Sequence, residues 1–495
     1  MTESKSSYLQ ILKATSIFGG MQFLNILISI VRTKLVALFI GPAGMGIIAL
    51  LNSALNTVGG ITGLGIETSA VKHISEQHNE EDLQSVSRIV TVVRKMTFWV
   101  GIFGALMVTA FSGVLSQLTF GNSNYTYLFV YLSGTLFFRQ LTVGQMVVFQ
   151  GLRKLKTLAK ANFYGNLIGL LLSVPLYYFY RIDAVVPTIV VTSLSSLLVS
   201  FYFSKQIKIQ KITIPNSQVL VEGKGIVKLG LMMSLSGLMT LLASYIIQIY
   251  VGKTGGLNQV GLYNSGFTLL NSYVGIVFTV MSTDYFPKLS SICNDKQKIR
   301  VSVIEQSYMS VFIMTPIVIL FLIFAPIIVQ ILFTSKFLSI IPMVCFGILG
   351  MLFRAVSWSM GFILIAKGDS EMFIKTAFCF NFLSVILNIL GYYFYGLDGL
   401  GFSFLIYYLV HLVAMKIITG KRYDFYFEDN FFRTYIICIA MCVAVFCMRY
   451  IQNPILKYSL MTLMIILFFG FVLYHLDKKI GLKYLFNSIS KRRND

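Results

Sequence analysis

The sequence predicts an all-α polytopic membrane protein of fourteen spans, arranged as two repeated six-span lobes followed by two further spans. Three observations lead to this fold class. Of the 495 residues, 56% are hydrophobic and only 12% are charged, and the mean hydropathy is +0.78. The lysines and arginines gather on alternate connections between apolar stretches, and the sequence matches itself at an offset of 215 residues. A water-soluble globular protein is therefore excluded.

The predicted spans are apolar stretches of roughly 20–30 residues, bounded by charged residues, glycine or proline. They lie at 12–40, 44–70, 93–115, 125–149, 160–180, 184–204, 226–251, 260–284, 306–333, 338–366, 371–395, 399–418, 432–450 and 456–475. The connections between them are short, so no sizeable soluble domain is expected. Glycines at 59, 60, 63 and 65 are expected to let the second span bend.

The net charge is +21, and the distribution of the basic residues along the chain indicates its orientation in the membrane. With a cytoplasmic N-terminus, 31 of the 40 lysines and arginines lie on the cytoplasmic side, five lie outside and four lie at membrane depth. The positive-inside rule then predicts that both termini are cytoplasmic. We therefore expect no nucleic-acid partner. The six cysteines are scattered without a metal-ligand spacing, so neither a metal nor a cofactor is expected.

The repeat at an offset of 215 residues joins polar as well as apolar positions. It pairs Lys13 with Lys228, Gly41 with Gly256, Gly46 with Gly261, Asn56 with Asn271, Arg139 with Arg354, and the run Tyr177–Tyr180 with Tyr392–Tyr395. This predicts lobes at 1–215 and 216–425, followed by two spans and a basic cytoplasmic tail at 426–495. An even number of spans makes the repeat parallel, which is typical of transporters that bind substrate between their lobes and rock to give alternating access. An old duplication that kept only packing residues is the alternative.

Four basic residues lie at membrane depth, where a charge normally faces protein or a wet cavity. They are Arg32, Lys34, Arg139 and Arg354, and the acids at comparable depth, Glu67 and Asp284, lie near the cytoplasmic ends of their spans. The cavity should therefore be cationic, and guanidinium groups match the oxygens of a phosphate. The alternatives are that Arg139 and Arg354 cap backbone carbonyls and that Lys34 reaches the outer interface.

Glu67 and Asp284 are candidates for ion coupling, because a carboxyl group at membrane depth can take up and release a proton. Asp284 lies four residues before Lys288, so an ion pair on the helix surface is the simpler interpretation for that residue.

Several segments carry a family resemblance. They are Arg32-Thr33-Lys34, Ile40-Gly41-Pro42-Ala43-Gly44-Met45-Gly46, Gly63-Leu64-Gly65-Ile66, Asp284-Tyr285-Phe286-Pro287, Ser335-Lys336-Phe337 and Ile365-Ala366-Lys367. In these segments the chain resembles the O-antigen translocases, the Wzx flippases of the multidrug/oligosaccharidyl-lipid/polysaccharide exporter superfamily. The resemblance covers residues 10–425, and the last two spans depart from the twelve-span members.

The resemblance implies a MATE-like fold of two six-helix bundles in a bacterial inner membrane. The implied function is translocation of undecaprenyl-pyrophosphate-linked oligosaccharide from the cytoplasmic to the periplasmic leaflet. The implied partners are this lipid-linked glycan, membrane lipids, a polysaccharide polymerase and a chain-length regulator. The candidate substrate-binding residues are Arg32, Asn56, Arg139, Asn271 and Arg354.

Two other functions compete with this interpretation. A membrane glycan polymerase or ligase needs a folded catalytic surface outside the membrane, and the outer connections here are short, so no enzyme is expected. A MATE-type drug/cation antiporter would want an acid within the lobe cavity, and most of the predicted spans carry no mid-span Asp or Glu.

Overall fold

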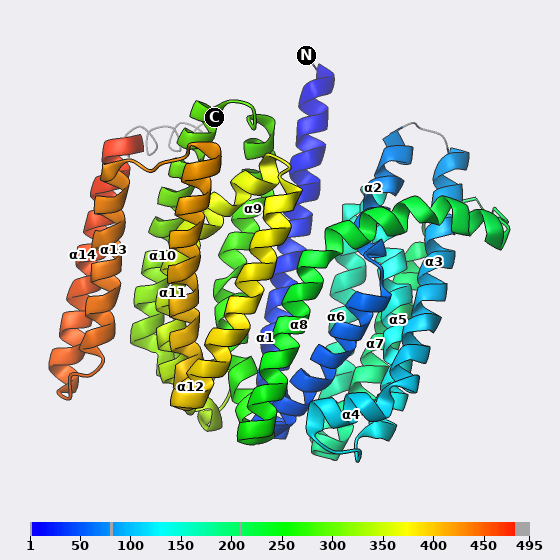
Figure 1. The fold of residues 1–495 in the computed structure, drawn as a ribbon, viewed down its shortest axis with the longest axis horizontal. Helices are drawn as coiled ribbons and strands as arrows, with labels where there is room; N and C mark the ends of the chain where they lie inside the picture. The colour runs from blue at the N-terminus through cyan, green and yellow to red at the C-terminus, as the bar shows by residue number, and fades with distance from the viewer. Residues whose placement is uncertain (1, 80–82, 208, 211, 481–495) are drawn as a thin grey trace. The chain divides into compact units, whose positions relative to one another are not determined.

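The computed structural model describes residues 2–79, 83–207, 209–210 and 212–480, and within this range the chain is helical and contains no strand (Figure 1). The basic tail beyond residue 480 lies outside the described residues. The helices up to residue 204 are α1 (Thr2–Thr62), α2 (Ile66–Asn79), α3 (Leu83–Ala110), α4 (Ser112–Phe120), α5 (Thr126–Gly151), α6 (Leu155–Tyr180), η1 (Arg181–Ala184) and α7 (Val185–Ser204). The later helices are α8 (Asn216–Thr268), η2 (Leu269–Val274), α9 (Ile276–Ser291), α10 (Lys296–Leu332), η3 (Ser335–Ile340), α11 (Ile341–Ala366), α12 (Ser370–Tyr423), α13 (Asp429–Met448) and α14 (Pro454–Ile480).

The predicted spans fall on these helices. Among the described residues, nine helical runs are long and apolar enough to cross a membrane. Four of the runs hold two predicted spans each: Leu24–Thr62, Leu155–Ser204, Asn216–Ser291 and Ser370–Tyr423. Five runs hold one predicted span each, and the remaining span, 125–149, is α5, which is helical but too polar to count among the nine.

The longest helices contain sharp breaks at glycine. The backbone leaves the helical region at Gly41 in α1, at Gly256 in α8 and at Gly396 in α12, each with a positive φ. Glycine adopts this conformation without the steric cost that a Cβ brings. The second predicted span also breaks as expected: α1 ends at Thr62, and Gly65 has a positive φ before α2 begins.

Backbone geometry repeats at the sequence offset of 215 residues. Gly41 and Gly256 have φ values of 65° and 80°. Arg153 and Gly368 have values of 54° and 67°, and Arg181 and Gly396 have values of 51° and 56°. A non-glycine residue rarely adopts positive φ. The same turns are therefore kept in the first copy even though arginine, and not glycine, occupies these two positions. The predicted lobe boundaries at residues 215 and 425 remain predictions.

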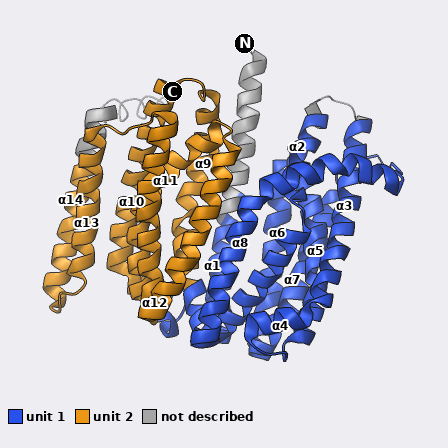
Figure 2. Cartoon of the chain, in the orientation of Figure 1, with its two compact units in different colours: residues 1–264, 330–337 blue, residues 265–329, 338–495 orange. Residues whose placement is uncertain are grey.

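The chain forms two compact units, one made of residues 1–264 and 330–337 and the other of residues 265–329 and 338–495 (Figure 2). In unit 1, α8 crosses α1 at very short range. A Cβ on Gly46 would overlap the carbonyl oxygen of Leu257, and a Cβ on Gly261 would overlap that of Pro42. Gly46 and Gly261 correspond in the repeat, as do Pro42 and Leu257, so the crossing is symmetric.

In unit 2, α11 is the most deeply buried element, with most of its apolar residues between Met343 and Leu364 inaccessible to solvent. Two buried tyrosines from other helices donate hydrogen bonds to its backbone. The hydroxyl of Tyr285 in α9 lies 2.9 Å from the Ser359 carbonyl oxygen, and that of Tyr435 in α13 lies 3.2 Å from the Leu352 carbonyl oxygen. The helix α13, which lies beyond the repeat, therefore belongs to the core of this unit.

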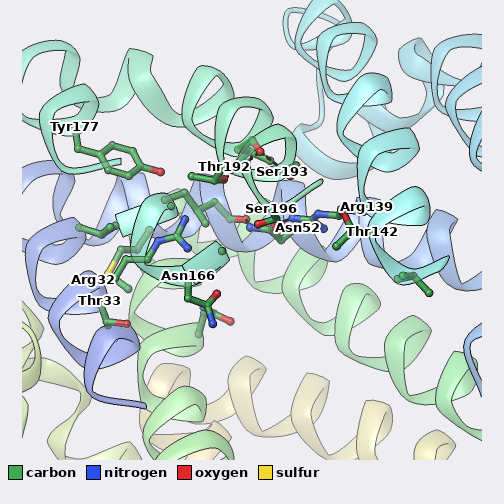
Figure 3. Close-up of a pocket in the computed structure, with 18 residues that line it drawn as sticks. Arg32, Thr33, Asn52, Arg139, Thr142, Asn166, Tyr177, Thr192, Ser193 and Ser196 are labelled. Atoms are coloured by element: carbon green, nitrogen blue, oxygen red, sulfur yellow. Dashed lines mark hydrogen bonds between the residues drawn. The ribbon is translucent and has the colours of Figure 1, made fainter. Parts of the chain in front are cut away.

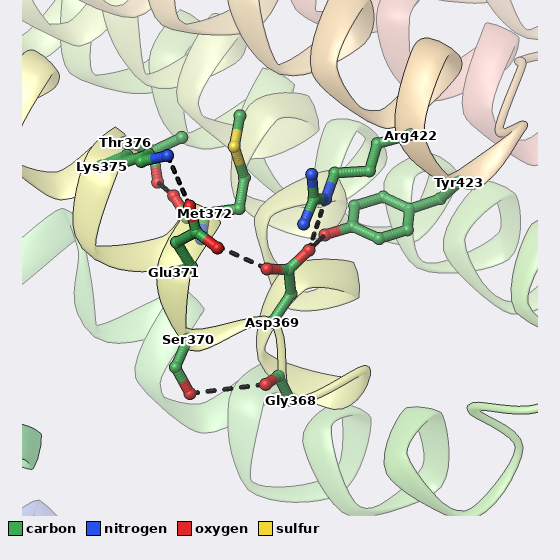
Figure 4. A network of polar contacts seen from close by, with 9 residues as sticks. All are labelled: Gly368, Asp369, Ser370, Glu371, Met372, Lys375, Thr376, Arg422 and Tyr423. Atoms are coloured by element: carbon green, nitrogen blue, oxygen red, sulfur yellow. Dashed lines mark hydrogen bonds and ion pairs between the residues drawn. The ribbon is translucent and has the colours of Figure 1, made fainter.

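A polar clasp joins the two ends of α12 (Figure 4). Asp369 is the N-cap residue and accepts a hydrogen bond from the Met372 amide at 3.2 Å. Its other carboxylate oxygen accepts from Arg422 Nε at 2.5 Å and from the Tyr423 hydroxyl at 2.6 Å. These partners, the Arg422 guanidinium first, lower the pKa of the Asp369 carboxyl to about 2.

The glycine crossing predicts an unequal effect of two alanine substitutions on α8. Gly261→Ala should destabilise the protein by about 1–3 kcal/mol, because the added methyl group forces α1 and α8 apart. Gly237→Ala is the matched control, since a Cβ there meets no atom within 4 Å and alanine favours the helix. Thermal unfolding of the detergent-solubilised protein measures both. Equal melting temperatures would contradict the close approach.

The clasp predicts that Asp369→Ala lowers stability by about 1 kcal/mol, the usual cost of removing an N-cap. Because the folded-state pKa lies below the unfolded value of about 3.9, the carboxylate stabilises the fold above about pH 4, and this contribution disappears as the pH falls towards 2. The difference in melting temperature between the parent and the variant should stay constant from about pH 8 to pH 5 and shrink at about pH 3. Glu371→Ala, which removes an exposed pair with Lys375 in the same turn, should change little. Equal losses from both variants would show that the clasp has no special role.

Candidate functional site

Unit 1 contains a cavity of about 590 Å³ whose walls come mainly from α1, α5, α6 and α7 (Figure 3). Its volume lies in the range of small-molecule binding sites. The lining residues are Arg32, Thr33, Val36, Met45, Ile48, Asn52, Arg139, Thr142, Val143, Gly165, Asn166, Gly169, Tyr177, Ile189, Thr192, Ser193, Ser196 and Asn264. This lining contains two arginines and no Asp, Glu, His or Cys, so the cavity is cationic.

Arg139 is held in the middle of α5 by two asparagines of α1. Its Nη2 donates to Asn52 Oδ1 at 2.7 Å, and its Nη1 donates to Asn56 Oδ1 at 3.2 Å. Asn52 is itself oriented, because its Nδ2 donates to the Ile48 carbonyl at 3.0 Å. The predicted alternative, in which Arg139 caps backbone carbonyls, is therefore wrong. The amide oxygens fix the guanidinium without neutralising its charge.

Arg32 reaches the cavity from α1 and makes no hydrogen bond or ion pair with any residue that the structure describes. Figure 3 shows Arg32 and Arg139 at opposite ends of a row of polar side chains that includes Asn52 and Ser196. A half-buried cation at membrane depth is costly unless protein, water or a ligand solvates it. The cavity therefore favours an anionic ligand.

Three polar side chains of the other wall donate hydrogen bonds within the protein. The hydroxyl of Thr192 donates to the Thr188 carbonyl at 2.7 Å, and that of Ser193 donates to the Ile189 carbonyl at 2.8 Å. Asn166 Nδ2 donates to Asn25 Oδ1 at 3.1 Å. The two guanidinium groups are thus the strongest donors available in the cavity. With no carboxylate or imidazole in the lining to activate a hydroxyl, the arrangement suits recognition of an anion.

Arg354 repeats the contact of Arg139 but in different surroundings. Its Nη1 donates to Asn271 Oδ1 at 2.8 Å, so the two Arg–Asn pairs correspond at the repeat offset. In unit 2, however, the guanidinium carbon lies 5.1 Å from the ring centre of Phe278 and 5.4 Å from that of Tyr408. These cation–π contacts stabilise the charge in place. Substrate binding by Arg354 and Asn271 stays a prediction.

The candidates for ion coupling lie elsewhere. Glu67 is exposed in the first turn of α2, where a negative charge favours the helix N-terminus. Asp284 is exposed on α9. The predicted pair of Asp284 with Lys288 is wrong, because Lys288 Nζ instead lies 3.7 Å from Glu305 Oε2. A coupling role for either acid remains a prediction.

Lys34 is bound at the end of a neighbouring helix, and its predicted position near the outer interface stays a prediction. Its Nζ donates to the Gln330 carbonyl at 2.7 Å and also to the Phe333 carbonyl. Both acceptors lie at the C-terminal end of α10, where carbonyl groups lack helical partners and a cation is favourable.

Sequence reasoning missed several cavity residues. Asn166 and Tyr177 match Asn381 and Tyr392 at the repeat offset, which is the one indication of them that the sequence contains. In the structure Tyr177 is buried and lines the cavity, whereas Tyr178 beside it is exposed. No feature of the sequence marks Asn52 as a site residue, because at the repeat offset it pairs with the apolar Phe267. Its role appears only in its contact with Arg139.

The helical architecture is similar to the MATE-like fold of solved membrane transporters. Over 93% of this chain and 99% of the other, it is similar to a lipid II flippase, MurJ, in an inward closed conformation, with TM-score 0.69 and 14% identity. It is also similar to an inward-facing multidrug resistance MATE transporter over 81% of this chain and 94% of the other, with TM-score 0.66 and 13% identity. The predicted MATE-like fold is confirmed.

Residues 35–342 match the model of the polysaccharide biosynthesis protein family, and the chain belongs to this family. Among its relatives is the lipid III flippase of Escherichia coli K12, 22% identical over 363 residues, which are 69% of this chain and 82% of that protein. An uncharacterised membrane protein of the Klebsiella pneumoniae cps region is 26% identical over 178 residues, which are 35% of this chain and only 36% of that protein. With its apolar helices, this chain is a multi-pass membrane protein.

The contrast between the two cavity arginines predicts opposite effects on stability. Arg139→Met should cost about 1–2 kcal/mol, because it leaves the Asn52 and Asn56 oxygens without their donor. Arg32→Met should be neutral or stabilising, since it removes a cation that has no hydrogen-bond or ion-pair partner among the described residues. Melting temperatures of the two purified variants test this. A larger loss in Arg32→Met would show that Arg32 is structural.

Proposed function

We propose that this protein is a flippase that moves a lipid-linked oligosaccharide across the membrane and that its cavity receives the pyrophosphate of the carrier lipid. The observation that carries the proposal is the pair of guanidinium groups, Arg32 and Arg139, in a cavity whose lining holds no acid. Pyrophosphate is a compact polyanion, and arginine recognises its oxygens with paired, charge-assisted hydrogen bonds. The polar walls suit the sugar that follows the phosphate.

The relatives support the substrate class. The family is one of polysaccharide biosynthesis, and a flippase of lipid III is among its similar members. In detail, we propose that the cargo is an undecaprenyl-pyrophosphate-linked repeat unit of O-antigen or a related surface polysaccharide. We further propose transport from the cytoplasmic to the periplasmic leaflet of a bacterial inner membrane by alternating access. Both termini would then be cytoplasmic, and a polymerase and a chain-length regulator would act on the exported unit.

The cavity argues against transport of organic cations, although a multidrug transporter shares the fold. Cation recognition needs a negative charge or an aromatic cage at the site. Arg32 and Arg139 would instead repel a cationic drug, and the cavity lining supplies no carboxylate.

The decisive test is complementation of a strain that lacks its own copy of this gene, scored by surface polysaccharide with membrane protein levels measured in parallel. Arg139→Gln and Arg32→Gln should each lower export about tenfold or more, because each removes a charge-assisted contact worth about 1.5–3 kcal/mol. Arg139→Lys should retain part of the export, since an ammonium keeps the charge but not the planar fork.

Lys156→Gln is the matched control, because it removes one exposed positive charge from the same unit. It should leave export unchanged. If both arginine variants are present at normal levels and still export glycan at the parent rate, the pyrophosphate is bound elsewhere and the proposal is wrong.

A further inference from the structure

A second cavity, of about 330 Å³, lies in unit 1 between α3 and the connection that follows α7. It shares no residue with the cavity of Arg32 and Arg139. Its lining residues are Thr91, Arg94, Lys95, Phe98, Ile209, Gln210 and Ile212. The charge distribution of the sequence predicts that this end of α3 is cytoplasmic. One side of the pocket is thus a charged helix face, and the other contains two isoleucines.

The wall formed by the connection is tied to α3 at two points. The backbone amide of Gln210 donates to Ser87 Oγ at 3.2 Å. Further along, Lys95 Nζ donates to the Ile214 carbonyl at 2.6 Å and lies 3.3 Å from Asn216 Oδ1. These contacts fix Gln210 and Ile214 of the connection against α3.

Arg94 and Lys95 bring two positive charges to the pocket, and neither makes an ion pair with a described residue. Arg94 Nη2 donates to Ser204 Oγ at 2.6 Å, and Ser204 Oγ in turn donates to Gln145 Oε1 at 2.8 Å. The Nε of Arg94 is buried and finds no hydrogen-bond partner in the described part of the chain. A buried donor on an unpaired cation is costly, and an anion in the pocket would relieve that cost.

An apolar stripe leads away from the pocket along α3. Phe98, Ile102 and Leu106 follow Arg94 at intervals of four residues, which places them along one face of the helix. All three are exposed on the surface of the chain, Leu106 by 62%. From Phe98 to Leu106 the stripe extends about 12 Å towards the middle of the membrane. The site therefore offers a cationic pocket at one end and a lipid-facing apolar surface at the other.

We propose that this pocket binds the phosphate of an anionic phospholipid of the cytoplasmic leaflet, with an acyl chain lying along Phe98, Ile102 and Leu106. Basic pockets at the cytoplasmic side of membrane helices are suited to such headgroups. Arg94 supplies the planar donors and Lys95 a second positive charge. A free phosphate ion would use the two cations but gain nothing from the stripe, which is why we assign the lipid.

The proposal is tested with the full-length protein in detergent, by native mass spectrometry and lipid-dependent thermal unfolding, neither of which depends on transport. The probes are phosphatidylglycerol, the zwitterionic phosphatidylcholine and inorganic phosphate. The parent should bind phosphatidylglycerol in preference to phosphatidylcholine. Arg94→Gln should weaken the binding of phosphatidylglycerol about tenfold, and Arg94→Lys should restore part of it. Lys156→Gln, the control, should bind as the parent does.

Leu106→Ser keeps the pocket intact and tests the stripe, so the proposal can be judged even if Arg94→Gln fails to fold. It should weaken binding of phosphatidylglycerol and leave any binding of inorganic phosphate unchanged. Equal binding of the two phospholipids would overturn the proposal, as would unaltered binding in both Arg94→Gln and Leu106→Ser. Protection by inorganic phosphate equal to that by phosphatidylglycerol would also overturn it, because the site would then take a free anion.

Discussion

At Gly46 and Gly261 the helices α1 and α8 approach so closely that a methyl group on either glycine would overlap a carbonyl oxygen of the other helix. In a membrane, helices gain little from hiding apolar surface from one another, so close backbone packing at small residues is a main source of association. The contact is symmetric, because Gly46 faces Leu257 and Gly261 faces Pro42, which are themselves repeat partners. The position of α8 in unit 1 depends on this crossing, and so does the presence of Asn264 in the cavity wall.

The cavity shows how the protein holds charge at membrane depth. Arg139 is fixed by the amide oxygens of Asn52 and Asn56, which are neutral and leave its charge available. Carboxylate partners would hold the arginine more tightly but would cancel the field that attracts an anion. Arg32 makes no hydrogen bond or ion pair with a described residue, and its charge adds to the cationic character of the cavity.

The repeat preserves backbone geometry more faithfully than it preserves surroundings. Positive φ recurs at Gly41 and Gly256 because both copies need the same break between two spans, and the Arg–Asn contact recurs as Arg139–Asn56 and Arg354–Asn271. Yet Arg139 faces an open polar cavity, whereas Arg354 is packed against two aromatic rings. The two copies thus place corresponding arginines in different surroundings.

The sequence by itself determined the membrane class, the approximate spans, the repeat offset and the basic residues at membrane depth. These follow from hydropathy, charge and identity, which are local or periodic properties of the chain. Only the tertiary structure decided which side of each helix meets a neighbour. It brought Asn52 to Arg139, turned Tyr177 inwards, left Glu67 and Asp284 exposed, and set Lys34 against the end of α10. These outcomes depend on how each helix rotates and packs, and in lipid nearly all faces of a span are equally apolar, so the pattern of residues does not specify that rotation.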